Sequence, residues 1–487
     1  MAQKYQMVIG TSHAEPMLRN NVSEWNQELG DYNYVTNSRN INAYWQSRLD
    51  EVKKSDNSAI MTLGMRGIHD SGMEGIKSRK EGMALVEDIF ANQRSMLSNT
   101  FKKPVEEIPQ VFIPYKEVLD VYDEGMTVPD DVTLMWTDDN YGYIRRLSNE
   151  KEQKRIGGSG VYYHLSYWGR PHDYLWLSTT QPGLIWYEMS RAYANGAKKI
   201  WIANVGDIKP TEYTMEFFLD LAWDVNSINQ ENINDHLEEW AARDLGNKVA
   251  MGTAAIMDEY YRLAFLRKPE YMGWSQTEPT TPTQLSKLSS GEAKRRIASY
   301  RSLVEQVDSL KAYVPKERLS AWFQLIAYPV KSAANMNYKF LYHQRAAISN
   351  DIQKQYKYSD LSSKAYEKIK ELTTNYNNLE NGKWEHMMSM SPRSLPVFDA
   401  LTININKVKI SRSAALDDHR IYIQGYEFTD SNGFEGYEWK PINGFGYSNS
   451  ALTLFPLKTA SFKDEKPWVS YEFDAKEIGN FQLEIRF

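Results

Sequence analysis

The sequence predicts an α/β fold whose N-terminal half is a parallel sheet of the (β/α)8 TIM-type barrel. Over the first 224 residues, short apolar runs alternate with helix-like segments, which is typical of βαβ units. The runs are apolar at most positions instead of at every second one, as expected of strands that are buried on both faces. Polar or charged residues follow each run directly, where parallel α/β folds bind their ligands.

Six strands are predicted, and they account for most of a barrel. They cover residues 7–12, 60–65, 110–114, 132–136, 160–166 and 199–205. A ring of strands brings all six polar ends to one mouth, whereas an open sheet would spread its outer strands away from a shared site. A closed barrel has eight strands. We therefore expect an incomplete barrel that lacks two leading βα units.

Four helices are predicted between these strands, over residues 41–54, 77–97, 141–154 and 182–195. The last has the clearest boundaries, because Pro182 suits a first helical turn and Gly196 suits a C-cap. Ile185 and Met189 lie on one face of this helix, as an amphipathic pattern requires.

Beyond residue 224 the pattern changes twice. Residues 225–392 contain long amphipathic segments, at 233–245, 249–267, 291–314 and 318–350, which predict a helical domain. Residues 393–487 alternate apolar and polar residues, as at 401–405, which predicts a C-terminal β-sandwich. The chain stops within the strand-like run FQLEIRF, so we expect this sandwich to be cut short. The predicted domains are thus residues 1–224, 225–392 and 393–487.

Composition excludes several classes of protein. With 57 basic and 63 acidic residues, the net charge of -6 offers no basic surface for nucleic acid or an anionic membrane. The absence of Cys excludes disulfides and thiolate metal sites. No signal-peptide-like or membrane-spanning apolar stretch is present, so neither nucleic acid nor a membrane is an expected partner. The 13% of aromatic residues fits either a sugar-binding surface or aromatic-rich cores.

Two acids occupy neighbouring strand ends. Asp70 and Glu117 follow the second and third predicted strands, and a glycosidase needs two carboxyl groups on either side of the scissile bond. Alternatively, such acids serve as helix caps, and Glu117 can simply open a helix over residues 116–123. Arg66 precedes Asp70 by one helical turn, and its guanidinium can grip a substrate carboxylate or pair with Asp70.

A metal site is the alternative that the histidines suggest. His13, His69 and His164 follow strands, as do Asp138 and Asp139, and barrel hydrolases can hold zinc through such residues. However, the chain contains no H-x-H or H-E-x-x-H spacing. Hydrogen bonds to sugar hydroxyls are therefore the favoured role, and neither a metal nor another cofactor is expected.

Six longer runs resemble successive motifs of glycoside hydrolase family 115. In the order of that family they are GTSHAEPMLRNN, TLGMRGIHDSGM, VFIPYKEVLDVY, LMWTDDNYGYIRRL, GGSGVYYHLSYWGRPHDYLWLSTT and WIANVGDIKPTEYTMEFFLDLAWD. The resemblance implies a barrel enzyme that removes α-1,2-linked glucuronic acid, or its 4-O-methyl ether, from glucuronoxylan with inversion and without a cofactor. It also implies a periplasmic or secreted full-length parent, although this chain carries no signal peptide.

The same resemblance assigns roles to individual residues. The catalytic pair is Glu117 of PYKEV and Asp70 of MRGIHD, without a decision on which is the acid and which the base. The implied substrate-binding residues are His13, Glu15, Arg66, Asn140, Tyr162, His164 and Asn204.

The chain also departs from the family. Members carry a further N-terminal domain and the first barrel strands ahead of the SHAEP motif, together with another active-site acid. The alternative function is therefore a catalytically impaired carbohydrate-binding fragment of such an enzyme, and a metal-dependent barrel hydrolase is the more distant one. A homodimer formed through the helical domain is a further expectation.

Overall fold

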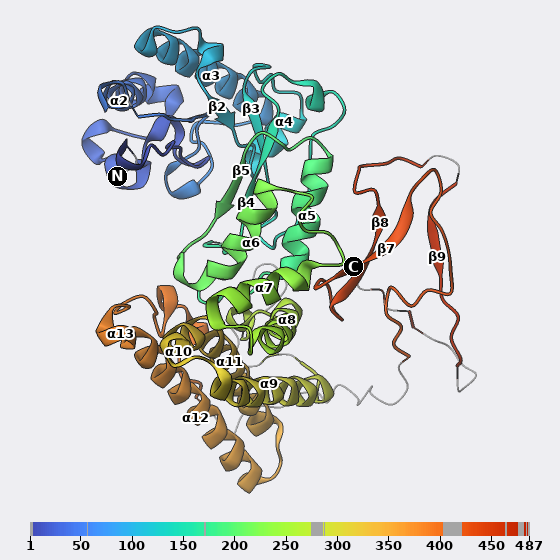
Figure 1. The fold of residues 1–487 in the computed structure, drawn as a ribbon. Coiled ribbons are helices and arrows are strands. Elements are labelled where there is room, and N and C mark those ends of the chain that lie inside the picture. The colour runs from blue at the N-terminus through green and yellow to red at the C-terminus, as the bar shows by residue number, and fades with distance from the viewer. Residues whose placement is uncertain are drawn as a thin grey trace. The chain divides into compact units, whose positions relative to one another are not determined.

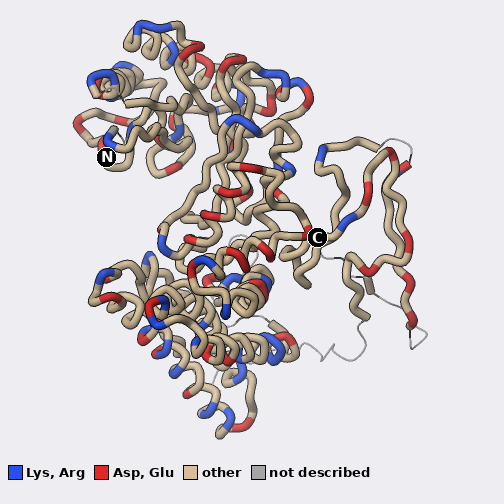
Figure 2. The backbone as a smooth tube through the Cα atoms, viewed as in Figure 1, with Lys and Arg blue, Asp and Glu red and all other residues tan. Residues whose placement is uncertain are grey.

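The computed structural model describes residues 3–55, 57–169, 172–273, 286, 288–402, 421–462, 465–475, 482, 483 and 485 (Figure 1). It divides into two compact units. The first comprises Met1–Tyr163 and Arg191–Ile202, and the second comprises His164–Ser190 and Ala203–Phe487. Lys and Arg residues are interspersed with Asp and Glu residues in both units (Figure 2). None of the helices in the described part of the chain combines the length and the apolar character needed to cross a bilayer.

A sheet of five parallel strands confirms the predicted α/β fold. Its strands lie in chain order, as in half of a barrel: β1 (Met61–Leu63), β2 (Gln110–Phe112), β3 (Thr133–Thr137), β4 (Ser159–His164) and β5 (Trp201–Asn204). The register pairs Leu63 with Phe112 and Trp136 with Val161. Because all strands run in the same direction, their carboxyl ends share one edge of the sheet.

The first predicted strand, residues 7–12, is wrong as a strand. Only Ile9 pairs with the sheet, through an isolated parallel bridge to Ala59 in which the Ile60 N–H donates to the Ile9 carbonyl at 2.8 Å. Met7 and Val8 are exposed. The burial that favours a regular strand is therefore missing on the N-terminal side of the bridge.

The predicted helix over residues 141–154 is also wrong. Two acidic side chains hold this segment in a turn instead: Asp138 accepts a hydrogen bond from the Gly142 N–H, and Asp139 accepts from those of Tyr141 and Tyr143. Gly142 has a positive φ of 94°. Side chains of Asp that bond to the nearby backbone compete with a helix in this way. Only residues Glu152–Lys154 form a short 3-10 turn.

The other predicted helices of this region are confirmed. They are α2 (Tyr34–Ser55), α3 (Arg79–Phe101), α5 (Pro182–Ala194) and the short α4 (Glu117–Asp123) that follows β2. In the first unit, Val111, Ile113, Met135 and Tyr162 form one core cluster on the sheet. Phe112 points to the opposite face of its strand. There its ring packs edge-on against Phe90 of α3, with 5.0 Å between the ring centroids.

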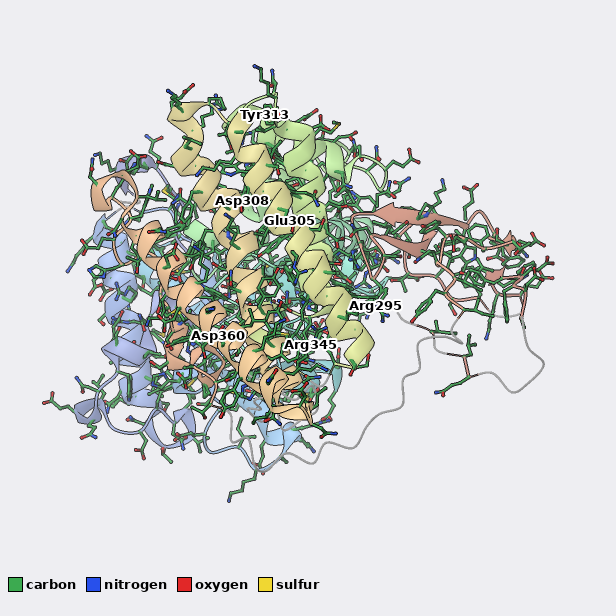
Figure 3. The ribbon with its side chains drawn as sticks, turned by 90° about the horizontal axis from the view of Figure 1, so that it is seen from below. Arg295, Glu305, Asp308, Tyr313, Arg345 and Asp360 are labelled. Carbon is green, nitrogen blue, oxygen red and sulfur yellow. The ribbon has the colours of Figure 1, made fainter. Side chains whose placement is uncertain are left out.

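The predicted helical region is confirmed in the second unit. Its helices are α6 (Glu212–Trp223), α7 (Ile233–Leu245), α8 (Ala250–Leu266), α9 (Ser290–Leu310), α10 (Leu319–Trp322), α11 (Tyr328–Ile348), α12 (Ile352–Asn377) and α13 (Leu379–Gly382). Figure 3 shows Glu305 and Asp308 on α9, Arg345 on α11 and Asp360 on α12. Many of the large side chains of the core in this unit are aromatic, including the fully buried Trp322.

The C-terminal region contains two antiparallel strand pairs. These are β6 (Asp430–Asn432) with β9 (Trp468–Ser470), and β7 (Glu438–Asn443) with β8 (Ser450–Phe455). The predicted strand at 401–405 falls outside the described residues from residue 403 onward, as does most of the run FQLEIRF. The β-sandwich and the three domain boundaries therefore stay predictions.

A buried lysine makes the stability of the second unit depend on pH. The ammonium group of Lys339 on α11 donates to the main-chain carbonyls of Val397 and Asp399 at 2.6 and 2.9 Å. Burial lowers the pKa of Lys339 to about 7, whereas an unfolded lysine titrates near about 10.4. In the window between these values the unfolded chain binds a proton that the folded chain lacks, so the free energy of unfolding rises with pH.

We therefore expect the stability of the wild type, relative to Lys339→Met, to increase between pH 7 and pH 9. Urea unfolding of both proteins at the two pH values measures this difference. Lys357→Met, which removes an exposed lysine of α12, is the matched control. A difference between wild type and Lys339→Met that stays constant with pH would contradict the expectation.

Candidate active site

The carboxyl ends of β1, β2 and β3 carry residues with unusual backbone geometry. His69 and Asp70 after β1 have φ of 58° and 59°, Lys116 after β2 has φ of 51°, and Asn140 after β3 has φ of 67°. Positive φ is uncommon for residues other than Gly, and such residues gather at functional sites, where surrounding contacts hold them. All four lie in the first unit, at the edge where the sequence predicted the site.

Arg66 connects the two predicted catalytic acids. Its Nε and Nη2 donate to Glu117 Oε1 at 3.0 and 2.9 Å, and Nη2 also donates to Glu117 Oε2 at 2.7 Å. Its Nη1 forms an ion pair with Asp70 Oδ1. One guanidinium thus binds Glu117 in a bidentate fork through Nε and Nη2, and it pairs with Asp70 through Nη1 on its other side. The structure brings Arg66, Asp70 and Glu117 together, as predicted.

The Arg66 guanidinium is buried, whereas the two carboxylates that it contacts are partly exposed. The Arg66 side chain is only 4% exposed, whereas those of Asp70 and Glu117 are 34% and 43% exposed. A molecule that arrives from solvent therefore meets the two carboxyl groups first. Proton transfer requires such access, because the acid or base must reach the reacting oxygen directly or through one water.

Two more polar groups contact Asp70. His13 Nε2 lies 2.8 Å from Asp70 Oδ1, and Lys116 Nζ donates to Asp70 Oδ2 at 3.0 Å. Burial, reinforced by the positive charge of Arg66, lowers the pKa of Lys116. Asp70 is thus contacted by Arg66, Lys116 and a histidine. The structure therefore places His13 beside Asp70, whereas its role toward substrate stays a prediction.

Tyr115 joins the remaining predicted residues to this group. Its hydroxyl donates to Asn140 Oδ1 at 2.7 Å, and its ring lies 4.6 Å from that of His13 between centroids. The ring of Tyr162 lies 6.1 Å from that of His13 and nearly perpendicular to it. Sequence reasoning did not include Tyr115 or Lys116 among the site residues. The available signal was their position in the PYKEV motif, directly before Glu117.

The other three predicted residues have local roles. Glu15 accepts a hydrogen bond from the Ser12 hydroxyl at 3.4 Å within its own turn. His164 and Asn204 belong to the second unit. There the buried His164 ring lies edge-on to Tyr167, with 5.1 Å between centroids, and the Asn204 carbonyl accepts from the Leu165 N–H at 3.0 Å.

The metal alternative requires at least three ligand side chains around one point. In the described ranges, no three His, Cys, Asp or Glu side chains are placed so that they could hold one ion. Asp138 and Asp139, which that alternative invoked, bond to the backbone of their own turn.

Two partly exposed carboxyl groups at the carboxyl edge of a parallel half-barrel sheet fit one class of protein, the glycoside hydrolases, which need such a pair. The family follows from comparison, since the model of "Glycosyl hydrolase family 115" matches residues 1–271. The chain belongs to glycosyl hydrolase family 115, which confirms the resemblance seen in its motifs.

A solved structure agrees with this assignment. The chain is 43% identical to BtGH115A, described as a family GH115 4-O-methyl-α-glucuronidase with specificity for decorated arabinogalactans, at a TM-score of 0.82. The similarity covers 92% of this chain and 58% of that chain, so this chain spans little more than half of that protein. An O-GlcNAc hydrolase mutant from Thermobaculum terrenum is 8% identical at a TM-score of 0.32, over 77% of this chain and 84% of that one, which is too low to show a shared fold. Among curated proteins, none matches the chain significantly.

Proposed function

We propose that this chain removes α-linked glucuronic acid, or its 4-O-methyl ether, from the side branches of a polysaccharide. Glu117 and Asp70 are the two carboxyl groups of the reaction. The observation that carries this proposal is the Arg66 guanidinium that lies between them. A planar carboxylate is the ligand that an arginine fork fits best, and a uronic acid presents one.

The proposed reaction is a single displacement. One carboxyl group of the pair, in its protonated form, gives its proton to the glycosidic oxygen while the bond from that oxygen to the anomeric carbon breaks. The other, as a carboxylate, takes a proton from a water molecule whose oxygen attacks the anomeric carbon from the opposite face. The sugar is thereby released with inverted configuration. We leave open which of Glu117 and Asp70 is the acid.

Substrate binding requires an exchange of partners at Arg66. The fork of Arg66 is held by Glu117 in this structure, and the uronate carboxylate has the same planar geometry. We propose that the uronate takes over this fork and releases Glu117 for its part in the reaction.

Two polysaccharides are candidates. The motif resemblance favours α-1,2-linked branches on glucuronoxylan, and the similarity to BtGH115A favours a decorated arabinogalactan. We expect the purified chain to release uronic acid from glucuronoxylan, measured by anion-exchange chromatography, with decorated arabinogalactan assayed in parallel. Release from arabinogalactan alone would overturn the xylan assignment. A folded chain that releases nothing from either would favour the alternative of a carbohydrate-binding fragment.

The family assignment supports three further proposals. The half-barrel sheet is part of a (β/α)8 barrel, the C-terminal strand pairs are part of a β-sandwich, and the full-length parent acts in the periplasm or outside the cell, where polysaccharides are met. Glucuronoxylan as the partner and a homodimer through the helical region are proposed on the sequence alone.

A further inference from the structure

Trp168 is an exposed tryptophan on a buried segment. It follows β4 by a few residues and belongs to the second unit, with its side chain 69% exposed. Tyr167 before it, and Tyr174 and Trp176 after it, are all buried. These buried residues lie on both sides of Trp168 along the chain. The indole of Trp168 is therefore exposed to solvent, whereas its neighbours along the chain are packed in the core.

A single buried carboxylate organises the surroundings of this indole. Asp173 is buried, and its Oδ1 accepts a hydrogen bond from the N–H of Gly169, the residue next to Trp168, at 2.6 Å. Its Oδ2 pairs with Nη1 of Arg393 at 2.5 Å. The Arg393 guanidinium carbon then lies 5.1 Å from the centroid of the Trp168 ring, within the range of a cation–π contact. Asp173 thus holds Gly169, the residue after Trp168, and the Arg393 guanidinium that lies over the Trp168 ring.

Further contacts with the helical region anchor the segment. Glu270, in the turn Pro269–Tyr271 after α8, is buried, and its Oε1 accepts from the N–H groups of Trp176 and Leu177 at 3.0 and 3.3 Å. The indole N–H of Trp176 donates to the Tyr328 hydroxyl at 3.1 Å. A surface that is rigid before it binds loses little conformational entropy on binding.

We propose that Trp168 and Arg393 form a subsite for a neutral main-chain sugar of the polysaccharide, an inference that rests on the proposed function. The indole face stacks on the C–H face of a pyranose ring, and the remaining N–H groups of Arg393 donate to its hydroxyls. Because the Asp173 carboxylate already neutralises the charge of Arg393, the subsite of Trp168 and Arg393 suits an uncharged sugar better than a second uronic acid.

The position of the pair on the chain fits this role. Trp168 follows Tyr167, whose ring contacts His164 at the carboxyl end of β4. Ligands of parallel α/β folds bind beyond these strand ends. A sugar of the polysaccharide main chain is therefore the ligand expected there.

Affinity electrophoresis of the whole chain in gels that contain glucuronoxylan or decorated arabinogalactan tests the proposal without requiring turnover. We expect Trp168→Ala to weaken binding of the polymer roughly three- to tenfold, as the loss of one aromatic stacking contact does. Binding of free glucuronic acid, measured by calorimetry, is expected to stay unchanged. Trp168→Phe should keep most of the affinity for polymer, and Arg393→Ala should weaken it.

Trp223 supplies the matched control, because it is 93% exposed at the end of α6 in the same unit. Trp223→Ala is expected to bind polymer like the wild type. Equal losses in the two Ala variants, unchanged binding in Trp168→Ala, or a wild type that binds no polymer would each overturn the proposed subsite. An absence of uronic acid release by a wild type that binds polymer would instead overturn the proposed function and leave the subsite intact.

Discussion

Glu117→Gln is expected to lower the rate of uronic acid release by about 10²- to 10⁴-fold, the usual contribution of a positioned general acid or base. Glutamine keeps the size of the side chain and one oxygen for the Arg66 fork. It can neither give up a proton as an acid nor accept one as a carboxylate. The effect should therefore appear in kcat, whereas the KM for the polymer should change little.

Glu124→Gln is the matched control for this variant. Glu124 lies at the C-terminal end of α4, the helix that Glu117 opens, and its side chain is 46% exposed against 43% for Glu117. It is also paired with an arginine, Arg79, at 2.6 Å. The control should release uronic acid like the wild type. If Glu117→Gln were equally active, the assignment of Glu117 would be wrong.

Asp70→Asn completes the test of the pair. Asp70 is held by Arg66, His13 and Lys116, so its amide variant also changes the charge around three neighbours. A loss of activity in both amide variants supports a two-carboxyl reaction. Activity that is retained in Asp70→Asn but lost in Glu117→Gln would point to a different partner for Glu117.

The strands that are buried were predicted from the sequence, whereas the exposed run at 7–12 was wrongly predicted to be a strand. The apolar runs that became β1 to β4 are packed on both faces, so the burial that stabilises them was visible in their composition. The run at 7–12 has similar composition, but Met7 and Val8 lie exposed at the edge. Exposure at an edge depends on neighbours in space, which a local pattern does not contain.

The helix predicted at 141–154 failed for a related reason. Its spacing of apolar residues suits a helix, but Asp138 and Asp139 lie just ahead of it and bond to the N–H groups that would open it. Such competition was accessible from the sequence, since Asp side chains favour turns and caps. The positive φ of Gly142 then completes the turn.

The sequence predicted several of the residues that the structure brings together, but only some of their contacts. The position of Arg66 one turn before Asp70 made their ion pair foreseeable, and the structure contains it. The hydrogen bonds from Arg66 to Glu117 connect the ends of two different strands. The local spacing of residues in the sequence therefore could not predict them. Tyr115 was not predicted as a site residue, because a tyrosine that directly follows a buried strand is usually a core residue.

The aromatic excess has two explanations, and both apply to particular residues. Tyr260, Tyr300 and Trp322 are fully buried in the helical region and account for part of it as core. Trp168 is exposed beside a cation and is the kind of residue that a sugar-binding surface requires. Composition alone did not separate these roles, because burial is decided by tertiary packing.

Arg66→Ala is expected to weaken the binding of glucuronic acid by roughly 10- to 150-fold, which corresponds to the loss of about 1.5–3 kcal/mol from hydrogen bonds to a charged group. Arg66→Lys should recover only part of this loss, because a lysine restores the charge without the planar fork. Calorimetry with glucuronic acid, and with glucose as the neutral analogue, measures the effect of the carboxylate alone.

The comparison of the two ligands separates recognition of the carboxylate from a general structural role. Because Arg66 is almost completely buried and holds both acids, its removal also leaves Asp70 and Glu117 without their shared cation. Such a disturbance would weaken the binding of glucose and of glucuronic acid alike, whereas loss of the planar Arg66 fork would weaken only the binding of glucuronic acid. Arg79→Ala removes an exposed arginine that is likewise paired with two acids, Asp120 and Glu124, and serves as the control. If Arg66→Ala weakened the binding of both sugars equally, Arg66 would have a structural role in the site and would not recognise the carboxylate of the substrate.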